Sequence, residues 1–401
     1  MADRDRFVIA GAGFAGGKAA LTLRDEGFDG EVLLVGAEAH PPYERPPLSK
    51  DYLRGESTFE QAQVEPAQAY AERDIELIAG VAAVALDTSA HELALADGRT
   101  VAYDRLLIAT GGVPRRPPIP GADLEGVQTL RTVDDCDRLR AAFERGGALA
   151  IIGAGWIGCE VAASARQRGL DVTVVELADR PLERVLGPEL GDFYAGVHRS
   201  HGVELMTGAQ VAAIEGTGRA ERVRLEDGRA IDCDGVLIAV GIAPDTRLAE
   251  AGGLDVDDGV LADERLATSA PDVFAAGDAV NAFHPRYRRH VRVEHWANAL
   301  EQGPAAARLM LDRGQPYDSL PYFFSDQYDV GMEYVGLHDP GDRVVTRGAM
   351  DASGFQAFWL SPDGRVTAGM HVNDWDAIEP IKALVGEGGT VDVDRLTQAG
   401  S

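Results

Sequence analysis

Two short stretches of the chain share the glycine spacing G-x-G-x-x-G, which favours the binding of a dinucleotide. The first glycine of such a set permits a tight turn, the second lets the backbone approach a pyrophosphate at a helix N-terminus, and the third lets the helix pack on a strand. The two sets are Gly11, Gly13 and Gly16 in "GAGFAG", and Gly153, Gly155 and Gly158 in "GAGWIG". We therefore expect two pyrophosphate-binding turns.

Each glycine set is followed by an acidic residue at the distance where a ribose would lie. Glu38 follows "EVLLVGA" and Glu176 follows "VTVV", 22 and 18 residues after the third glycine of their sets. A carboxylate about 20 residues beyond the glycines is placed to accept hydrogen bonds from a ribose diol. The two acids strengthen the dinucleotide interpretation.

The elements that must position these residues are also repeated. Each copy has a buried strand, the glycine turn, a helix and a second strand, then a meander with an Asp-Gly turn and a closing strand. The meanders are "HELALADGRTVAYD" and "RVRLEDGRAIDCD", and the closing strands are "DRLLIATGG" and "DGVLIAVGI". One glycine set alone is often only a strand-to-helix turn, but a repeat of whole domains predicts two bound dinucleotides.

Composition disfavours several classes of protein. The chain has 401 residues, 45% hydrophobic and 26% charged, as expected for a soluble globular protein of two or three domains. Its net charge of −27 argues against nucleic acid as a partner. No uncharged apolar run approaches the roughly 18 residues of a membrane span, so we expect no membrane association. The glycine-interrupted N-terminus, with Lys18, does not fit a secretory signal.

The three cysteines, Cys136, Cys159 and Cys233, stand alone in the sequence. Neither a disulfide framework nor a Cys-x-x-Cys pair is present, which favours a cytoplasmic protein.

Four further segments make the chain resemble flavoproteins of the pyridine nucleotide-disulfide oxidoreductase type. Among these it resembles the NADH-dependent ferredoxin reductases that serve Rieske-type dioxygenases and cytochromes P450. The segments are "PPYERPPLSKDYL", "TSAPDVFAAGDAV", "VEHWANALEQG" and "PYFFSDQYDVGMEYVG". The resemblance implies an α/β fold with two Rossmann-like domains, an NADH-binding domain (113–242) inserted in a FAD-binding domain (1–112 and 243–320). Residues 321–401 would form a C-terminal α+β reductase domain.

The resemblance also implies which residues contact FAD. The segment "TSAPDVFAAGDAV" would supply Asp278 to the ribityl chain, although an aspartate in such a turn also suits a helix N-cap. Relatives often have an acid directly after the second strand, where this chain has Gly36 and Ala37 before Glu38. Trp296 is expected to shield the isoalloxazine edge, the alternative being a core aromatic. The remaining expected contacts are Ala15, Arg45, Val81, Thr110, Gly111, Arg131, Glu294 and His295.

The stretch "RPPLSK" is expected to be a rigid loop that holds a cation beside the flavin. Consecutive prolines suit neither a helix interior nor a central strand, and they leave the loop little conformational entropy to lose. Reduction by hydride places negative charge on the flavin ring, which a fixed cation stabilises. In the resembling family this lysine, here Lys50, pairs with a glutamate on the first helix of the NADH domain, here Glu160. The alternative is that both are solvated, although a glutamate in the first turn of that helix would point toward the nucleotide.

The acid of the second glycine set bears on the choice of nicotinamide. Glu176 would hydrogen-bond the 2′-hydroxyl of NADH and repel the 2′-phosphate of NADPH. The next two residues, Leu177 and Ala178, supply no cation for such a phosphate, but Arg180 and Arg184 lie close enough to weaken the argument. We predict NADH as the donor, with further contacts from Ile157, Arg184 and Gly241.

The resembling disulfide reductases, NADH oxidases and peroxidases carry a redox cysteine beside the flavin, and here no cysteine precedes residue 136. Electrons are therefore expected to leave to an external acceptor. A flavin can join a two-electron donor to a one-electron acceptor such as a 2Fe–2S ferredoxin, which would feed a cytochrome P450 or a Rieske oxygenase.

The segment "HPRYRRHVR" is basic in an otherwise acidic chain, and it could steer an acidic ferredoxin. The alternative is a solvated loop whose arginines pair with neighbouring carboxylates. Its arginines are Arg286, Arg288, Arg289 and Arg292. The nearby histidines lie among these cations, which would repel a metal ion, so we expect no metal.

Two other functions stay open at this point. One is an NADH oxidase or a rubredoxin or nitrite-reductase-type electron donor, and the missing cysteine disfavours the oxidase. A redox-sensing interaction protein like apoptosis-inducing factor shares the "RPPLSK" motif, but its basic nucleic-acid-binding surface is hard to place on a chain of charge −27. We expect a monomer or a weak homodimer.

Overall fold

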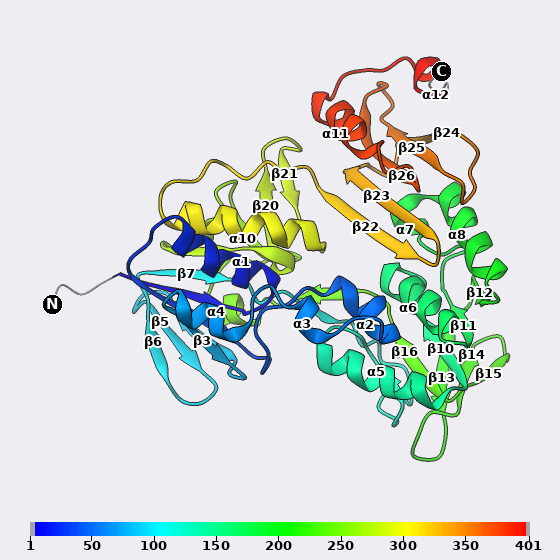
Figure 1. Ribbon diagram of the computed structural model, residues 1–401, viewed down its shortest axis with the longest axis horizontal. Coiled ribbons are helices and arrows are strands. Elements are labelled where there is room, and N and C mark those ends of the chain that lie inside the picture. The colour runs from blue at the N-terminus through cyan, green and yellow to red at the C-terminus, as the bar shows by residue number, and fades with distance from the viewer. Residues whose placement is uncertain (1–4, 398–401) are drawn as a thin grey trace. The chain divides into compact units, whose positions relative to one another are not determined.

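The computed structural model describes residues 5–397, which divide into two compact units (Figure 1). The first unit contains the chain up to Arg45, Phe59–Val113 and Ile242–Ser319. The second contains Pro46–Thr58, Pro114–Gly241 and the chain from Leu320 onward. Each unit is therefore assembled from segments that are far apart in the sequence.

A five-stranded parallel sheet in the order β19-β7-β1-β2-β3 forms the centre of the first unit. Its strands are β1 (Arg6–Ala10), β2 (Glu31–Gly36), β3 (Ile75–Ala79), β7 (Arg105–Ile108) and β19 (Val273–Ala275). After their first residue, β1 and β2 are buried without interruption, as expected for strands covered on both faces. β19 pairs with β7, so residues beyond the expected inserted domain complete this sheet.

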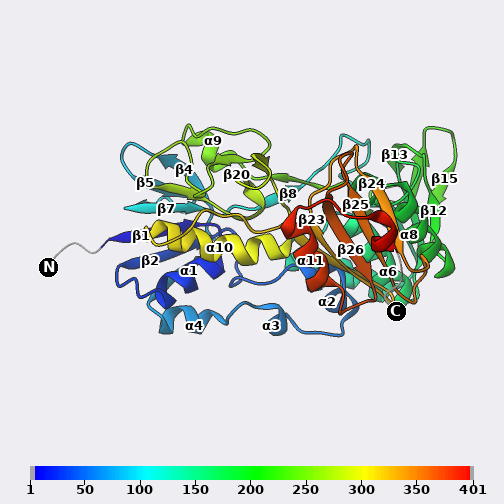
Figure 2. The same ribbon diagram turned by 90° about the horizontal axis from the view of Figure 1, so that it is seen from above.

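Two helices of the first unit, α1 (Phe14–Asp25) and α10 (Trp296–Met310), lie side by side against the sheet (Figure 2). Gly303 permits this approach, because a Cβ atom there would lie 2.3 Å from the carbonyl oxygen of Ala15. The unit also contains α3 (Phe59–Ala62), α4 (Ala67–Glu72), α9 (Arg247–Ala251) and the 3₁₀ turn η2 (Gly277–Ala279). Two small sheets complete it: β4 (Ala83–Asp87) with β5 (Glu92–Leu95) and β6 (Thr100–Ala102), and β18 (Val260–Ala262) with β20 (Val280–His284) and β21 (Arg289–Val291).

The second unit repeats this plan in residues 114–241. Its parallel sheet has the order β12-β11-β10-β16-β9, which corresponds to β3-β2-β1-β7-β19 of the first unit. The strands are β9 (Val127–Gln128), β10 (Ala148–Ile152), β11 (Asp171–Val175), β12 (Glu204–Met206) and β16 (Gly235–Ile238). The helices are α5 (Val133–Arg145), α6 (Trp156–Gln167), α7 (Glu183–Leu186) and α8 (Pro188–Ser200). The meander is β13 (Val211–Glu215), β14 (Arg222–Leu225) and β15 (Ala230–Asp232), so the predicted domain repeat is confirmed.

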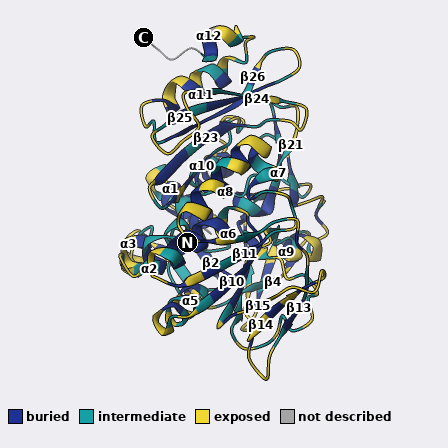
Figure 3. Ribbon diagram, turned by 90° about the vertical axis from the view of Figure 1, so that its right-hand side faces the viewer, coloured by how far each residue is buried: buried dark blue, intermediate teal, exposed yellow. Residues whose placement is uncertain are grey.

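The C-terminal part of the second unit is an antiparallel sheet in the order β22-β23-β26-β25-β24. Its elements are β22 (Tyr322–Gln327), β23 (Val330–Gly336), β24 (Arg343–Arg347), β25 (Phe355–Leu360), β26 (Val366–Val372), α11 (Ile378–Glu387) and α12 (Val393–Thr397). Strands β23 and β26 are largely buried (Figure 3). The strands β8 (Gly112–Pro114) and β17 (Ile242–Pro244) pair where the chain leaves and re-enters the first unit.

The stretch "RPPLSK" forms regular structure rather than the expected loop. Residues 46–49 make the 3₁₀ turn η1 (Pro46–Ser49), and α2 (Asp51–Arg54) follows. The two prolines occupy the first two positions of the turn, where a backbone N–H would have no intrahelical partner in any case. Apart from Arg45, the stretch belongs to the second unit.

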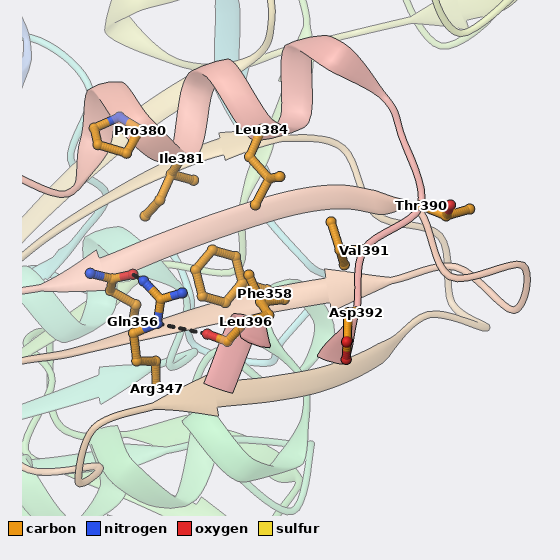
Figure 4. Close-up of a pocket in the computed structure, with 10 residues that line it drawn as sticks. All are labelled: Arg347, Gln356, Phe358, Pro380, Ile381, Leu384, Thr390, Val391, Asp392 and Leu396. Carbon is orange, nitrogen blue, oxygen red and sulfur yellow. Dashed lines mark hydrogen bonds between the residues drawn. The ribbon is translucent and has the colours of Figure 1, made fainter. Parts of the chain in front are cut away.

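A pocket of about 440 Å³ lies between α11, α12 and strands β24 and β25 (Figure 4). The Arg347 guanidinium donates to the carbonyl oxygen of Leu396 at 2.6 Å and to Oε1 of Gln356 at 3.2 Å. It also lies over the ring of Phe358, 5.6 Å from the centroid. These contacts make Arg347 part of the attachment of α12 to the sheet. Within residues 5–397 no helix has the length and apolar character to cross a membrane.

Candidate functional site

The first glycine turn joins β1 to α1, and its three glycines have different surroundings. Gly11 has φ +124°, and a Cβ atom there would lie 2.1 Å from the carbonyl oxygen of Ala109. A Cβ at Gly16 would lie 1.9 Å from the carbonyl oxygen of Gly11. At Gly13 a Cβ would meet nothing within 4 Å, and no side chain caps the helix that starts there. The outer two glycines are thus required by packing, while Gly13 leaves a space next to unsatisfied backbone N–H groups, which suits a phosphate.

At the carboxyl end of β2, Glu38 lies in a cluster with an arginine and a tyrosine. Its Oε1 accepts a hydrogen bond from Nη2 of Arg45 at 2.8 Å, and its Oε2 accepts one from the Tyr43 hydroxyl. The guanidinium also lies 5.3 Å from the Tyr43 ring centroid. The sequence led us to expect Glu38 and Arg45 at a cofactor, and the structure places them together. Tyr43 was not expected, although it stands in the quoted segment "PPYERPPLSKDYL".

Asp278 lies in the 3₁₀ turn η2 that follows β19. The turn is anchored by Gln302 of α10, whose Oε1 accepts a hydrogen bond from the N–H of Gly277 at 2.9 Å. Gln302 is itself buried and also accepts from Nδ2 of Asn298 at 3.1 Å. Asp278 lies close enough to Arg45 and His295 to interact with both electrostatically. Gln302 was missed because nothing in "EHWANALEQG" indicates which turn it would hold.

The residues at the start of α10 lie near the first glycine turn. Trp296 stacks on Phe14 of α1 with the ring centroids 5.6 Å apart, so it is at least partly a packing residue. Burial lowers the pKa of His295 to about 4, although Asp278 opposes the shift. His295 is therefore neutral at pH 7. The neighbouring Glu294 accepts a hydrogen bond from Arg292.

The remaining residues expected at FAD are divided between the units. Val81 packs at the edge of the first core, Thr110 donates to the carbonyl oxygen of Asp245 at 2.7 Å, and Gly111 follows it. Ala15 is buried in α1. Lys50 and Arg131 both belong to the second unit.

The second glycine turn, between β10 and α6, reproduces the geometry of the first. Gly153 has φ +104°, and a Cβ there would lie 2.5 Å from the carbonyl oxygen of Ala239. A Cβ at Gly158 would lie 2.1 Å from the carbonyl oxygen of Gly153, whereas at Gly155 it would meet nothing within 4 Å. The exposed side chain of Ile157 lies two residues beyond this opening, and Gly241 follows β16. A second phosphate fits here for the same physical reasons.

Glu176 follows β11, and its carboxylate lies on the glycine turn. Oε2 accepts from the backbone N–H of Ala154 at 2.6 Å, and Oε1 accepts from that of Ala178 at 2.8 Å. Arg180, which weakened the sequence argument, is tied to Asp192 at 2.7 Å, while Arg184 is exposed on α7. The charge next to the turn is therefore mainly negative.

Lys50 and Glu160 form a largely buried ion pair inside the second unit. Nζ of Lys50 lies 2.8 Å from Oε2 of Glu160, and the side chains are 12% and 5% exposed. The hydroxyls of Ser49 and Ser325 donate to the same carboxylate at 2.5 and 2.8 Å. Phe324 lies beside the lysine, with Nζ 5.5 Å from the ring centroid. The solvated alternative for this pair is therefore wrong.

The position of Glu160 corrects one expectation. Helix α6 begins at Trp156, so Glu160 is its fifth residue and lies just beyond the first turn. From there the buried side chain reaches Lys50 and the two serines. Ser49 and Ser325 could not be found from the sequence, because their role depends on three distant segments meeting at one carboxylate.

The basic segment divides into two parts in the structure. Arg286, Arg288 and Arg289 are exposed near the β20–β21 hairpin. Arg292 is less exposed, and it forms ion pairs with Glu294 and with Asp258, the latter at 3.2 Å. Its charge is matched locally, so the paired alternative applies to Arg292.

The three cysteines are buried as free thiols. Burial raises the pKa of Cys136 to about 12 and that of Cys233 to about 11, and it also raises the pKa of Cys159. These groups are therefore protonated and unreactive at pH 7. Among the side chains of residues 5–397, no cluster of three or more His, Cys, Asp or Glu could hold a metal ion.

The comparison with known families agrees with the two glycine turns. The family described as pyridine nucleotide-disulphide oxidoreductase matches residues 5–303, and the domain described as reductase C-terminal matches residues 322–401. The chain belongs to the pyridine nucleotide-disulphide oxidoreductase family. It is accordingly an oxidoreductase with FAD and NAD(H) as cofactors.

Proteins similar to this chain match it over nearly its whole length. The probable ferredoxin reductase CtmF of Castellaniella defragrans is 40% identical over 92% of this chain and 90% of its own. Putidaredoxin reductase CamA of Pseudomonas putida is 38% identical, over 93% of this chain and 90% of its own. A solved covalent putidaredoxin reductase–putidaredoxin complex superposes with a TM-score of 0.94 and 36% identity, covering 98% of this chain and 95% of that chain.

Proposed function

We propose that this chain is an NADH-dependent ferredoxin reductase that supplies electrons to a cytochrome P450 or a Rieske oxygenase. The reaction is NADH plus two oxidised 2Fe–2S ferredoxins giving NAD⁺, two reduced ferredoxins and one proton. FAD, when bound, joins the two half-reactions because it exchanges electrons either in pairs or singly. The observation that carries the proposal is the buried ion pair between Lys50 and Glu160, a residue of the helix that starts at the second glycine turn.

Residues of the first unit would hold the adenine dinucleotide part of FAD. The opening at Gly13 and the uncapped start of α1 would take the pyrophosphate. Glu38 and Arg45 would contact the adenosine part, and Asp278 would contact the ribityl chain from a turn that Gln302 holds in place. Lys50, which belongs to the second unit, would supply the cation that stabilises the negative charge arriving with a hydride.

Residues of the second unit would hold NADH. The opening at Gly155 would take the pyrophosphate, and Glu176 would turn from Ala154 or Ala178 to accept from the ribose 2′-hydroxyl. NADPH would be disfavoured, because its 2′-phosphate would meet this carboxylate while Arg180 is engaged by Asp192.

The proposed ferredoxin-docking surface consists of Arg286, Arg288 and Arg289, which are exposed near one hairpin. The similar protein from Burkholderia cepacia is named an anthranilate 1,2-dioxygenase system ferredoxin–NAD(+) reductase component, which supports a ferredoxin as partner. Arg288→Glu is expected to raise KM for ferredoxin several-fold at low salt, and added salt should reduce the difference. Arg343→Glu makes the same charge change elsewhere and serves as the control. Equal effects of the two variants would contradict this location.

We also assign a separate role to each domain of the chain. Residues 1–112 and 243–320 would bind FAD, residues 113–242 would bind NADH, and residues 321–401 would form the C-terminal reductase domain. We also propose a cytoplasmic protein that is a monomer or a weak homodimer. Sedimentation at several concentrations, with and without NADH, would test the oligomeric state, and a stable dimer at every concentration would contradict it.

Stopped-flow absorbance is the experiment that tests the function. The purified flavoprotein is mixed with NADH or NADPH, and a 2Fe–2S ferredoxin is then added. We expect NADH to bleach the flavin much faster than NADPH does, and ferredoxin to restore its colour much faster than air does. If air reoxidises the flavin as fast as ferredoxin does, an NADH oxidase would be favoured. Slow bleaching by NADH, with no reoxidation of the flavin by ferredoxin, would favour a redox sensor.

A further inference from the structure

A chain of buried hydrogen bonds runs away from Glu160 on the side opposite Lys50. Ser325 Oγ donates to Oε1 of Glu160 at 2.8 Å, and Nε2 of Gln327 lies 3.2 Å from that Oγ. Oε1 of Gln327 lies 2.9 Å from Nε2 of His198, and Nδ1 of His198 lies 3.4 Å from the Tyr328 hydroxyl. Ser325, Gln327 and His198 are each at most 1% exposed.

The side chains of this network come from one strand, one helix and the residue that follows the strand. Ser325 and Gln327 are two residues apart on β22, so their side chains point to the same face of the sheet. His198 lies near the end of α8, and its ring is also within aromatic contact of Tyr328, with the centroids 5.5 Å apart. All of these elements lie within the second unit.

The carboxylate at one end of the chain sets the direction of every hydrogen bond in it. An ionised carboxylate only accepts, so the Ser325 hydroxyl must donate to Glu160. Ser325 Oγ then accepts from the Gln327 amide N–H, which turns the amide oxygen toward His198 and requires a proton on Nε2 of that imidazole. Nδ1 of His198 is left to accept from Tyr328. In the opposite direction a buried carboxylate oxygen would lose its donor, which is costly.

Buried polar groups of this kind usually have either a structural or a positioning role. A purely structural network would leave the chemistry at Glu160 unaffected when it is altered. Here the network ends on the Glu160 carboxylate, which also pairs with Lys50. Ser325 donates to Oε1 of this carboxylate, while Lys50 contacts Oε2. A rotation of the carboxylate would therefore break both contacts together.

We propose that Ser325, Gln327 and His198 are positioning residues that fix the Glu160 carboxylate against Lys50 and so support hydride transfer. This rests on the proposed function. The residues act through Glu160 and do not themselves touch the reacting atoms. Because each link depends on the next, removal of any one link should have nearly the same effect as removal of two.

Gln327→Glu is the sharpest test, because it keeps the size of the side chain and reverses the hydrogen bonding. A carboxylate at this position accepts from both His198 and Ser325, so the serine hydroxyl is drawn away from Glu160. Ser325→Ala removes the same donor directly. Gln210→Glu makes the same chemical change at an exposed position of the second unit and is the control.

Stopped-flow bleaching by saturating NADH and the Kd of NADH would be measured for each holoprotein. We expect Gln327→Glu and Ser325→Ala each to slow bleaching about tenfold, as when one hydrogen bond to a charged group is lost, with the Kd of NADH changed less than twofold. The double variant should be no slower than either single variant. Rates within twofold of wild type, or a double variant slower by the product of the two effects, would overturn the proposal.

Nitrogen NMR of the histidine rings gives a readout that does not depend on activity. Wild-type holoprotein should show His198 as a neutral ring with its proton on Nε2 between pH 6 and 8, and the ring should become titratable in this range in Gln327→Glu. A proton on Nδ1 in the wild type would overturn the proposed direction even if no variant folds. A wild-type protein that NADH fails to bleach would refute the proposed function, and the NMR result would still test the network.

Discussion

Replacement of Lys50 by methionine would show how much the second unit depends on its buried ion pair. Methionine keeps the aliphatic length and leaves Glu160 without its cation. Removal of one partner of a buried pair typically costs about 3–5 kcal/mol, because the other charge is left in a medium of low polarity. Glu160 would keep the hydroxyls of Ser49 and Ser325, so we expect a loss near the lower end, about 3 kcal/mol in the free energy of unfolding.

The assay is urea denaturation of the holoprotein, with unfolding monitored by tryptophan fluorescence. Lys50→Met is compared with Glu160→Gln and with the double variant. The double variant removes both charges, so we expect it to be more stable than the sum of the single losses predicts, by about 2 kcal/mol. Strictly additive losses would mean that the two side chains do not interact.

Lys382→Met is the matched control in the same unit. Lys382 pairs with Glu379 at the same distance of 2.8 Å, but its side chain is 37% exposed and that of Glu379 is 77% exposed. An exposed pair is worth about 0–1 kcal/mol, so we expect little change in this variant. If Lys50→Met costs no more than Lys382→Met, the reasoning from burial is refuted.

Three further predictions concern single residues. Glu176→Ala should weaken NADH binding and reduce the NADH-over-NADPH ratio of kcat/KM by tenfold or more. The reason is that the Glu176 carboxylate and the 2′-phosphate of NADPH, as like charges about 4 Å apart, repel each other by roughly 1–4 kcal/mol. An unchanged ratio would contradict this. Burial lowers the pKa of His198 to about 4, whereas an unfolded histidine titrates near 6.5. The unfolded chain therefore binds more protons in between, so acidification from pH 7 to pH 5 should cost about 2 kcal/mol through this ring. His198→Gln should lose less stability over that range in urea melts, and an equal loss would count against the assignment. Gln302→Leu leaves the buried N–H of Gly277 unsatisfied at about 1–3 kcal/mol, so FAD should dissociate roughly tenfold or more readily on dilution if Asp278 holds it.

The glycine turns were predictable because their requirements are steric and local. A Cβ at Gly11 or Gly153 would collide with backbone of a neighbouring strand, and a Cβ at Gly16 or Gly158 would collide with the turn itself. Such constraints appear in the sequence as fixed spacing. The two parallel sheets followed from the same repeat, whereas the return of β19 to the first sheet agrees with the insertion that the resemblance implied.

The polar contacts around the carboxylates were not predictable in this way. Ser325 reaches Glu160 across 165 residues of sequence, and Gln302 reaches Gly277 through helix packing. A serine or glutamine carries no local signal for the partner that it finds after folding. The loop expectation for "RPPLSK" failed for a different reason, because prolines at the start of a 3₁₀ turn lose no hydrogen bond.

The interleaving of the two units has a consequence for the order in which the molecule can form during synthesis. Strand β7 ends at residue 108, but its neighbour β19 begins only at residue 273. At about 5–20 residues per second, the outer edge of β7 lacks its native partner for roughly 10–30 s as the chain leaves the ribosome. An unpaired strand edge invites pairing with other chains. Residues 114–241 emerge completely within this interval, so the inserted domain can assemble its parallel sheet while the sheet that surrounds it in sequence is still incomplete.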